Sequence, residues 1–467
     1  MQGVTRRSKK GKWRRRLSGI EDLKQLAAQL NICIDAIEDV SILAEPVEIG
    51  GLVIPNSLAV HPMEAADGDR QGRPGKLTFR RYERFAAGGA GLLWAEAIAV
   101  VPEGRANPRQ LWLNENSKEN FAALVKRMKQ SAESSPLAHR PVIVAQLTHS
   151  GRYSKPVSMP AARCSLLDSQ TCPERSRRSA NRKSQIVTDE YLDELSDAYV
   201  KAARIAYEVG FDAVDIKSCH GYLISELLTC YNRKGKYGGS FENRTRFLLE
   251  VIDKIHKELG EDRPVVTRLG LYDAVPYPFG WGVDRRDYTK PDLTEPRKLI
   301  AALRAAGVKM INVTVANPHH NPHYGRPFNE PIIDGYASPE HPLVGVSRLI
   351  GLAGKIQKEF PDVAVVGTGY SWLGTLFPSV AAASKANGLA TIIGVGRLAF
   401  AYPDFAKDII RKGRLDRRKV CIACSKCTQI MVDGGMIGCV VRDNKIYGPI
   451  YEQRRCDESK RTSQINS

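Results

Sequence analysis

Eight short runs rich in β-branched residues recur between residues 45 and 412, and longer amphipathic stretches separate them. This alternation is typical of repeated β-α-β units, which build parallel sheets. Eight such repeats in one stretch of chain predict an α/β fold, a closed (β/α)8 TIM barrel over residues 45–412. The expected strands are Ser57–Pro62, Gly91–Ala97, Pro141–Leu147, Phe211–Lys217, Pro264–Leu269, Val308–Thr314, Asp362–Gly367 and Leu389–Val395.

Four segments do not follow this alternation of β-branched runs and amphipathic stretches. Residues 1–44 combine a basic tail with one expected helix over residues 21–30, and residues 156–186 form a Ser/Arg-rich stretch that we expect to be a mobile insertion. Residues 413–445 carry four closely spaced cysteines, and residues 446–467 form a polar tail. The sequence therefore predicts a barrel followed by a short C-terminal cysteine segment.

The formal net charge of +18 is unevenly placed. Residues 1–16, 162–185 and 411–467 carry net charges of +8, +4 and +7, so the rest of the chain is close to neutral. This placement favours solvated basic arms, or docking of an acidic protein partner, over specific binding of nucleic acid.

Nothing in the sequence indicates a membrane protein. No run approaches the roughly 18 to 20 apolar residues that a spanning helix needs. The basic N-terminus lacks the apolar stretch that would follow it in a signal peptide. We therefore expect a cytoplasmic protein, in which cysteines stay reduced.

Polar residues gather where the expected strands end, the position that carries function in such barrels. The third strand leads into Gln146 and His149, the fourth into Lys217, and the fifth ends near Arg268. Glycines after the last two strands let backbone N–H groups approach an anion. They predict a phosphate site formed by Gly367, Gly369, Gly396 and Arg397.

Several motifs resemble the Old Yellow Enzyme family of FMN-dependent NADH:flavin oxidoreductases and ene-reductases. They are QLTHSGR, GFDAVDIKSCHGYLISELL, NRKGKYGGSFENRTRFLLEVI and GVGRLAFAYPDF, and the resemblance spans roughly residues 45–412. It implies FMN as cofactor, NAD(P)H as a direct or indirect electron donor, and hydride transfer between the flavin and an activated C–C or C–N bond in a small-molecule substrate. The sequence leaves the oligomeric state open, with a homo-oligomer as one alternative.

The resemblance also implies residue roles. Gln146 would bind the pyrimidine edge of the flavin, Arg268 would lie by its N1 and C2 carbonyl, and Tyr222 would be the proton donor. The remaining cofactor contacts would come from Pro62, Met63, Glu64, Ala97, Gly367, Gly369, Gly396 and Arg397.

Departures from the family concern the substrate. Lys217 stands where many relatives have a histidine, and with His220 it would polarise the substrate, which argues against a simple enone. Glu64 replaces a common Thr or Cys. In the loop 317–327, the pair His323 and Arg326 is expected to face the substrate, as is His149 after the third strand.

The cysteines follow the pattern C-x2-C-x2-C-x11-C, with Cys421, Cys424, Cys427 and Cys439. Four close thiolates suit zinc or an iron-sulfur cluster, and the C-x2-C-x2-C core favours the cluster, with free thiols as a third alternative. The branch that resembles 2,4-dienoyl-CoA reductase and trimethylamine dehydrogenase has a similar motif after its barrel, which implies a [4Fe-4S] cluster here. Those relatives continue into FAD and NADH domains, so a separate partner such as a ferredoxin, a flavodoxin or a reductase is expected.

Two other functions stay open on the sequence. A lysine at the end of a barrel strand is also how Schiff-base lyases are built, which would give Lys217 a covalent role. The chain could alternatively be a non-catalytic electron-transfer subunit. Borohydride trapping of a carbonyl substrate onto Lys217 would favour the first, and loss of turnover in Tyr222→Phe with the cofactors intact would speak against the second.

Overall fold

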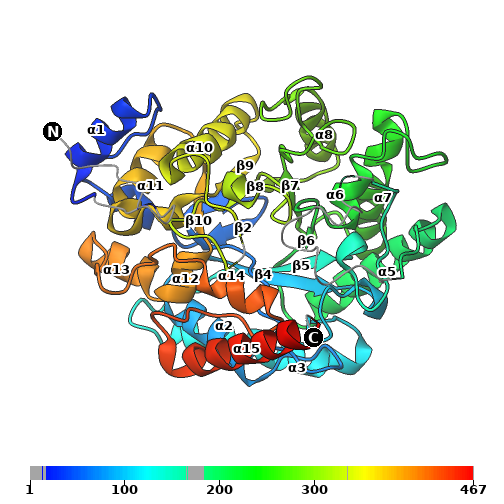
Figure 1. Ribbon diagram of the computed structural model, residues 1–467, viewed down its shortest axis with the longest axis horizontal. Coiled ribbons are helices and arrows are strands. Elements are labelled where there is room, and N and C mark those ends of the chain that lie inside the picture. The colour runs from blue at the N-terminus through cyan, green and yellow to red at the C-terminus, as the bar shows by residue number, and fades with distance from the viewer. Residues whose placement is uncertain (1–12, 14–16, 165, 167–182, 334, 466–467) are drawn as a thin grey trace.

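The computed structural model describes residues 13, 17–164, 166, 183–333 and 335–465, and its centre is a closed barrel of eight parallel strands (Figure 1). The strand order around the barrel is β10-β3-β4-β5-β6-β7-β8-β9. The predicted TIM barrel is thus confirmed, and each expected run overlaps one strand, although β4, β5 and β7 extend one or two residues beyond the expected ends. The strands are β3 (Leu58–Val60), β4 (Leu92–Ala99), β5 (Val142–Thr148), β6 (Ala213–Ile216), β7 (Val265–Gly270), β8 (Met310–Thr314), β9 (Ala364–Gly367) and β10 (Ile392–Val395).

Helices surround the barrel because their apolar faces cover the outside of the strands. Local signals fix where they begin: the Thr188 hydroxyl accepts the Tyr191 N–H at 3.1 Å before one helix, and the Ser240 hydroxyl accepts the Asn243 N–H at 3.3 Å before another. The main outer helices are α2 (Lys76–Ala87), α3 (Lys118–Glu133), α5 (Asp189–Glu208), α7 (Phe241–Leu259), α8 (Thr294–Ala305), α10 (Pro342–Glu359), α11 (Phe377–Ala386) and α13 (Phe405–Lys412).

The barrel strands are buried on both faces, as expected of a parallel sheet covered by helices. An antiparallel hairpin, β1 (Val47–Ile49) and β2 (Leu52–Ile54), contributes Ile49 and Ile54 to the cluster of apolar side chains inside the barrel. This hairpin closes the amino-terminal end of the barrel. Loops follow the carboxyl-terminal ends of the strands. They include the short helices α6 (Leu223–Leu227), α9 (Pro322–Gly325) and α12 (Arg397–Ala401).

The described parts of both terminal segments pack on this barrel. The helix expected over residues 21–30 is α1 (Ile20–Gln29). At the other end come α14 (Lys426–Val432) and α15 (Asn444–Ile465), so the segment expected to be a polar tail is helical. Arg80 and Arg84 of α2 both pair with Asp443 at 2.7 Å, and α15 lies beside α2 (Figure 1).

Most of the expected insertion, residues 165 and 167–182, lies outside the described residues, as does most of the basic N-terminal tail. Among the helices that the structure describes, none combines the length and apolarity needed to cross a bilayer.

Candidate functional site

A cavity of about 200 Å³ opens at the carboxyl-terminal ends of the strands, and we call it the barrel-mouth pocket. It collects residues from the ends of β3, β7 and β8 and from the loops after β6, β9 and β10. Eight of the predicted site residues line it: Pro62, Met63, His220, Arg268, Arg326, Gly369, Gly396 and Arg397. Residues that are up to 335 positions apart in the sequence are therefore brought to one cavity by the barrel closure.

Buried polar atoms without partners mark this pocket as a binding site. Within the described part of the chain, Arg268 Nε, Arg397 Nη1 and His61 Nε2 have no hydrogen-bond partner. An unpaired buried polar group costs stability, so such atoms are expected to meet a ligand. Two guanidinium groups favour an anionic ligand or one that gains negative charge.

The glycine loops shape the phosphate end of the pocket. Gly369 has φ +102°, and a side chain there would meet Leu349 at 2.8 Å. Ser371, which was not among the predicted residues, accepts the N–H groups of Gly396 at 3.2 Å and Leu398 at 3.3 Å through its hydroxyl. The predicted phosphate site thus gains a serine whose hydroxyl sits in the same pocket.

His61 was also missed. Its ring packs where a side chain at Gly394 would lie 2.3 Å away, so glycine is required on the neighbouring strand. Burial and the nearby Arg268 lower the pKa of His61 well below its ordinary value, so the ring is neutral. The signal was present, because His61 directly precedes Pro62 at the end of an expected strand.

Gln146 does not line the pocket but lies beside it on a buried network. Asp215 of β6 accepts hydrogen bonds from Gln146 Nε2 at 2.6 Å, Trp94 Nε1 at 2.7 Å and the Arg268 N–H at 2.6 Å. Burial raises the pKa of Asp215 to about 6, although these donors oppose the shift. The carboxylate therefore orients both Gln146 and the Arg268 backbone.

We expect Asp215→Asn to lower the free energy of unfolding by about 1–3 kcal/mol, because an amide leaves at least one of three buried donors unpaired. Gln146 would also lose its fixed orientation. Chemical denaturation measures the effect. The matched control is Asp197→Asn, which breaks an exposed ion pair with Lys254 and is expected to cost less than about 1 kcal/mol. Equal effects of the two substitutions would contradict this account.

Glu64, Lys217 and Tyr222 form one hydrogen-bonded trio next to the pocket. The Tyr222 hydroxyl donates to Glu64 Oε1 at 2.5 Å, Lys217 Nζ donates to the same oxygen at 3.3 Å, and Nζ lies 3.5 Å from the centre of the Tyr222 ring. Burial and the Glu64 carboxylate raise the pKa of Tyr222 well above its ordinary value. Tyr222 therefore stays protonated over the whole neutral range.

Replacing Glu64 by Gln is expected to lower the pKa of Tyr222 toward its ordinary value, because the carboxylate that disfavours the phenolate is gone. The alkaline limb of any Tyr222-dependent rate should then move to lower pH. A pH profile of the variant against wild type measures this shift. An unchanged alkaline limb would show that Glu64 does not control Tyr222.

The remaining predicted residues make other contacts. His220, with φ +66°, lies 3.2 Å from Thr314 Oγ1, and Ala97 packs against Tyr222. His149 accepts the Gly151 N–H at 3.0 Å and contacts the Tyr191 hydroxyl at 3.0 Å, away from the pocket lining. His323 is buried against the Tyr336 hydroxyl at 2.5 Å, while its expected partner Arg326 reaches the pocket. Gly367 is the last residue of β9 and is not among the residues that line the barrel-mouth pocket.

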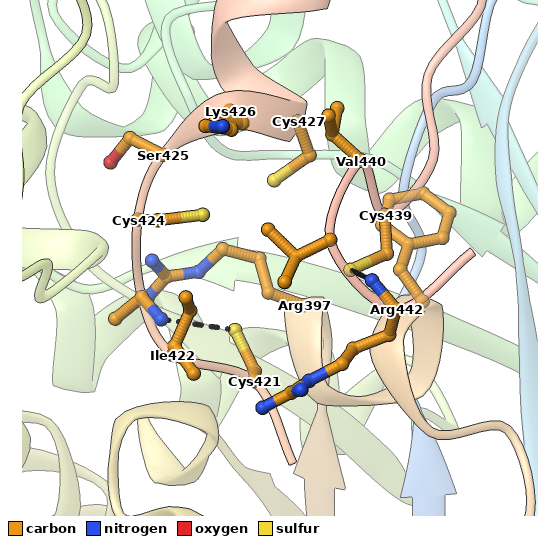
Figure 2. Close-up of a pocket in the computed structure, with 13 residues that line it drawn as sticks. Arg397, Cys421, Ile422, Cys424, Ser425, Lys426, Cys427, Cys439, Val440 and Arg442 are labelled. Atoms are coloured by element: carbon orange, nitrogen blue, oxygen red, sulfur yellow. Dashed lines mark hydrogen bonds between the residues drawn. The ribbon is translucent and has the colours of Figure 1, made fainter. Parts of the chain in front are cut away.

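The four predicted cysteines line a second hollow, the cysteine pocket (Figure 2). Their sulfur atoms point toward the same space: Cys421 and Cys424 come from the loop before α14, Cys427 from the first turn of α14, and Cys439 from the segment after this helix. Ala423 and Ser425 adopt left-handed φ values of +55° and +57°, which curl the loop around the hollow. Backbone N–H groups of Ala423 and Arg442 donate to the sulfurs of Cys421 and Cys439 at 3.4 and 3.3 Å.

The cysteine pocket places four thiols beside positively charged side chains, among them Arg397 and Arg442. Burial raises the pKa of Cys439 to about 12 in the protein alone. Across the described residues, no group of three or more His, Cys, Asp or Glu side chains is arranged to hold a metal ion. The loop is nevertheless tied to the barrel, because Ile437 N–H donates to Ala65 O at 2.8 Å, two residues after Met63.

Known proteins resemble this chain over the barrel. The model of the NADH:flavin oxidoreductase / NADH oxidase family matches residues 42–279. An NADPH dehydrogenase of Clostridium acetobutylicum is 29% identical over 233 residues, which cover 49% of this chain and 64% of that protein. An NADH oxidase of Thermoanaerobacter brockii is 26% identical over 388 residues, 81% of this chain and 52% of that protein. The chain thus spans less than two thirds of the length of these two relatives.

Solved structures share the fold. A 2-naphthoyl-CoA reductase in complex with 2-naphthoyl-CoA has a TM-score of 0.70 at 20% identity, covering 88% of this chain and 58% of that one. An old yellow enzyme homologue from Zymomonas mobilis has a TM-score of 0.57 at 19% identity, covering 80% and 94%.

Proposed function

Because the chain belongs to the NADH:flavin oxidoreductase / NADH oxidase family of FMN-dependent enzymes, we propose that it transfers hydride between FMN and an activated C–C or C–N bond while a [4Fe-4S] cluster relays electrons to or from a partner. The observation that carries this proposal is the barrel-mouth pocket, where buried nitrogens of Arg268 and Arg397 lack partners among the described residues, directly beside the cysteine pocket.

The residues present fit FMN. Arg397 with the loops at Gly369 and Gly396 would hold its phosphate, Arg268 its pyrimidine, and Pro62 and Met63 its ring. FMN supplies the hydride acceptor and donor when bound. Arg268 would stabilise negative charge at the pyrimidine, since its Nε is unpaired and its Nη1 makes only a 3.4 Å contact to Pro62 O.

Tyr222 would exchange the proton that accompanies hydride transfer. Its hydroxyl donates to the Glu64 carboxylate, which also accepts from the Lys217 ammonium, so the proton that Tyr222 gives up would be replaced from Lys217 through this carboxylate. His220 would face the substrate from the pocket wall, with Lys217 behind Tyr222 adding positive charge. Arg326 also reaches this pocket, whereas His149 and His323 would support the surrounding loops.

The four cysteines would bind the cluster. A cluster places each thiolate on its own iron, so it does not require the four sulfurs to converge on one point, as a single zinc ion does. The cluster supplies single-electron transfer when bound.

Six exposed basic residues precede Cys421, and they support docking of an acidic carrier such as a ferredoxin or flavodoxin. They are Arg411, Lys412, Arg414, Arg417, Arg418 and Lys419. Electron transfer that is indifferent to high salt would argue against this carrier.

The lyase alternative is weakened by one contact. Lys217 is only 5% exposed and pairs with Glu64, so its amine is not a free nucleophile. The electron-transfer alternative is tested by Tyr222, which a pure relay would not need.

Anaerobic purification with absorbance, iron, sulfide and flavin analysis tests the proposal. Flavin bands with about four irons per chain would support it. Flavin with zinc or without metal would reduce it to an FMN barrel that must take hydride from NAD(P)H directly. Absence of both flavin and iron would reject it.

A further inference from the structure

Arg397 belongs to both pockets. It follows β10 and lines the barrel-mouth pocket together with Gly369 and Gly396. It also lines the cysteine pocket with all four cysteines, where Figure 2 shows its side chain extending alongside the sulfur atoms. One guanidinium group therefore stands between the proposed flavin phosphate site and the proposed cluster site.

No side chain in the described part of the protein neutralises Arg397; the phosphate of bound FMN would be its anionic partner, and removing the guanidinium would still withdraw one positive charge from beside the cysteines. Its Nη2 donates to the Pro327 carbonyl at 2.6 Å, and its Nη1 is buried without a hydrogen-bond partner. Among the described residues, the hydrogen-bond acceptor of Arg397 is thus a backbone carbonyl and not a carboxylate. A fixed charge in a poorly solvated position acts more strongly on its neighbours than an exposed charge does.

A second arginine reaches the same boundary from the opposite loop. Arg326 lines the barrel-mouth pocket, and its Nη1 donates to the Ser425 hydroxyl at 3.1 Å. Ser425 lies between Cys424 and Cys427, and its hydroxyl donates to the Glu330 carbonyl at 2.6 Å. Arg326 is therefore attached to the cysteine loop itself, and positive charge faces this loop from two sides.

We propose that Arg397, supported by Arg326, raises the reduction potential of the iron-sulfur cluster and so favours electron entry from the flavin side. The inference rests on the proposed function. A cluster gains negative charge on reduction, and nearby positive charge stabilises that state. Arg397 is thereby a positioning residue for electron transfer, in addition to its expected contact with the flavin phosphate.

The test is an anaerobic potentiometric titration of the FMN- and cluster-loaded protein, followed by electron paramagnetic resonance. At the wild-type midpoint potential, Arg397→Met should lower the ratio of reduced to oxidised cluster about tenfold, equivalent to about 59 mV for one electron. Arg397→Lys, which keeps the charge, should stay near wild type. Arg326→Gln should shift the ratio in the same direction as Arg397→Met.

Lys426 provides the matched control, because it lines the same cysteine pocket but is exposed, so water screens its charge. Lys426→Gln should leave the midpoint nearly unchanged. A wild-type midpoint in Arg397→Met with full iron, or an equal shift in Lys426→Gln, would overturn the inference. Should Arg397→Met fail to hold iron, Arg326→Gln decides: an unchanged midpoint rejects the proposal and a lowered one supports it.

Iron analysis separates this result from a failure of the proposed function. A wild-type protein that holds no iron after reconstitution rejects the cluster, and the role of Arg397 falls with it. A wild-type protein with full iron whose midpoint ignores both arginines rejects only the role of these residues.

Discussion

Tyr222→Phe is expected to lower turnover on the order of 100- to 10,000-fold, the usual contribution of a positioned proton donor. The phenol is 8% exposed, and its hydroxyl is held by Glu64 at 2.5 Å, so no water is as well placed to replace it. The substitution removes one oxygen and leaves the ring that packs on Ala97 and Tyr153. The loss should therefore be chemical rather than structural.

Stopped-flow measurement with two half-reactions isolates this effect. Flavin reduction by NAD(P)H needs no proton from Tyr222, so its rate should stay close to wild type. Reoxidation of the reduced flavin by an activated alkene, chosen by a screen of enones and enoyl thioesters, should be slow in the variant.

Tyr153→Phe is the matched control, because Tyr153 contacts the Tyr222 ring at 5.8 Å between centroids but bonds Asn317 instead of Glu64. Equal losses in the two variants would indicate packing damage. Unchanged reoxidation in Tyr222→Phe would favour the electron-transfer alternative.

The sequence predicted the barrel well because strand burial leaves a direct signal. Each strand of a parallel barrel is covered on both faces, so it reads as a short apolar run between helices. The ends of these runs also located Arg268, Gly369, Gly396 and Arg397, which the closed barrel brings to one pocket.

Contacts between distant side chains were not predictable in the same way. Glu64 was expected to touch the cofactor, which stays a prediction, and its bonds to Tyr222 and Lys217, more than 150 positions away, were not foreseen. Its partners depend on which strands are neighbours across the barrel and on side-chain directions. The same reason explains why Asp215 was missed, since its role comes from three donors on other strands.

The surroundings of the cysteine segment could be predicted only in part. Spacing alone indicated that the four cysteines act together, and they do line one hollow. Spacing could not indicate that Arg397 of the barrel reaches the same hollow, because that contact depends on how residues 413–445 fold back. The bonds from Ile437 to Ala65 and from Arg80 to Asp443 fix that position.

Cys427→Ala is expected to abolish cluster binding, so the iron content should fall from about four per chain to near zero. Three remaining thiolates leave one iron without a protein ligand, and Cys427 is the one cysteine of α14 (Lys426–Val432), so this helix offers no second thiol to replace it. Flavin content should persist, because the residues proposed to hold FMN come from the barrel. Flavin and iron are measured on the same anaerobic preparation.

Cys456→Ser is the control for this substitution. Cys456 is an exposed thiol in α15, close in sequence to the cluster segment but outside the cysteine pocket. It should keep iron and flavin at wild-type levels. Iron that survives in Cys427→Ala would remove these cysteines as ligands, and zinc that is lost instead would assign the pocket to a tetrahedral ion. Loss of flavin together with iron in Cys427→Ala would show that the cysteine segment also holds the barrel-mouth pocket in shape, which the bond from Ile437 to Ala65 makes physically reasonable.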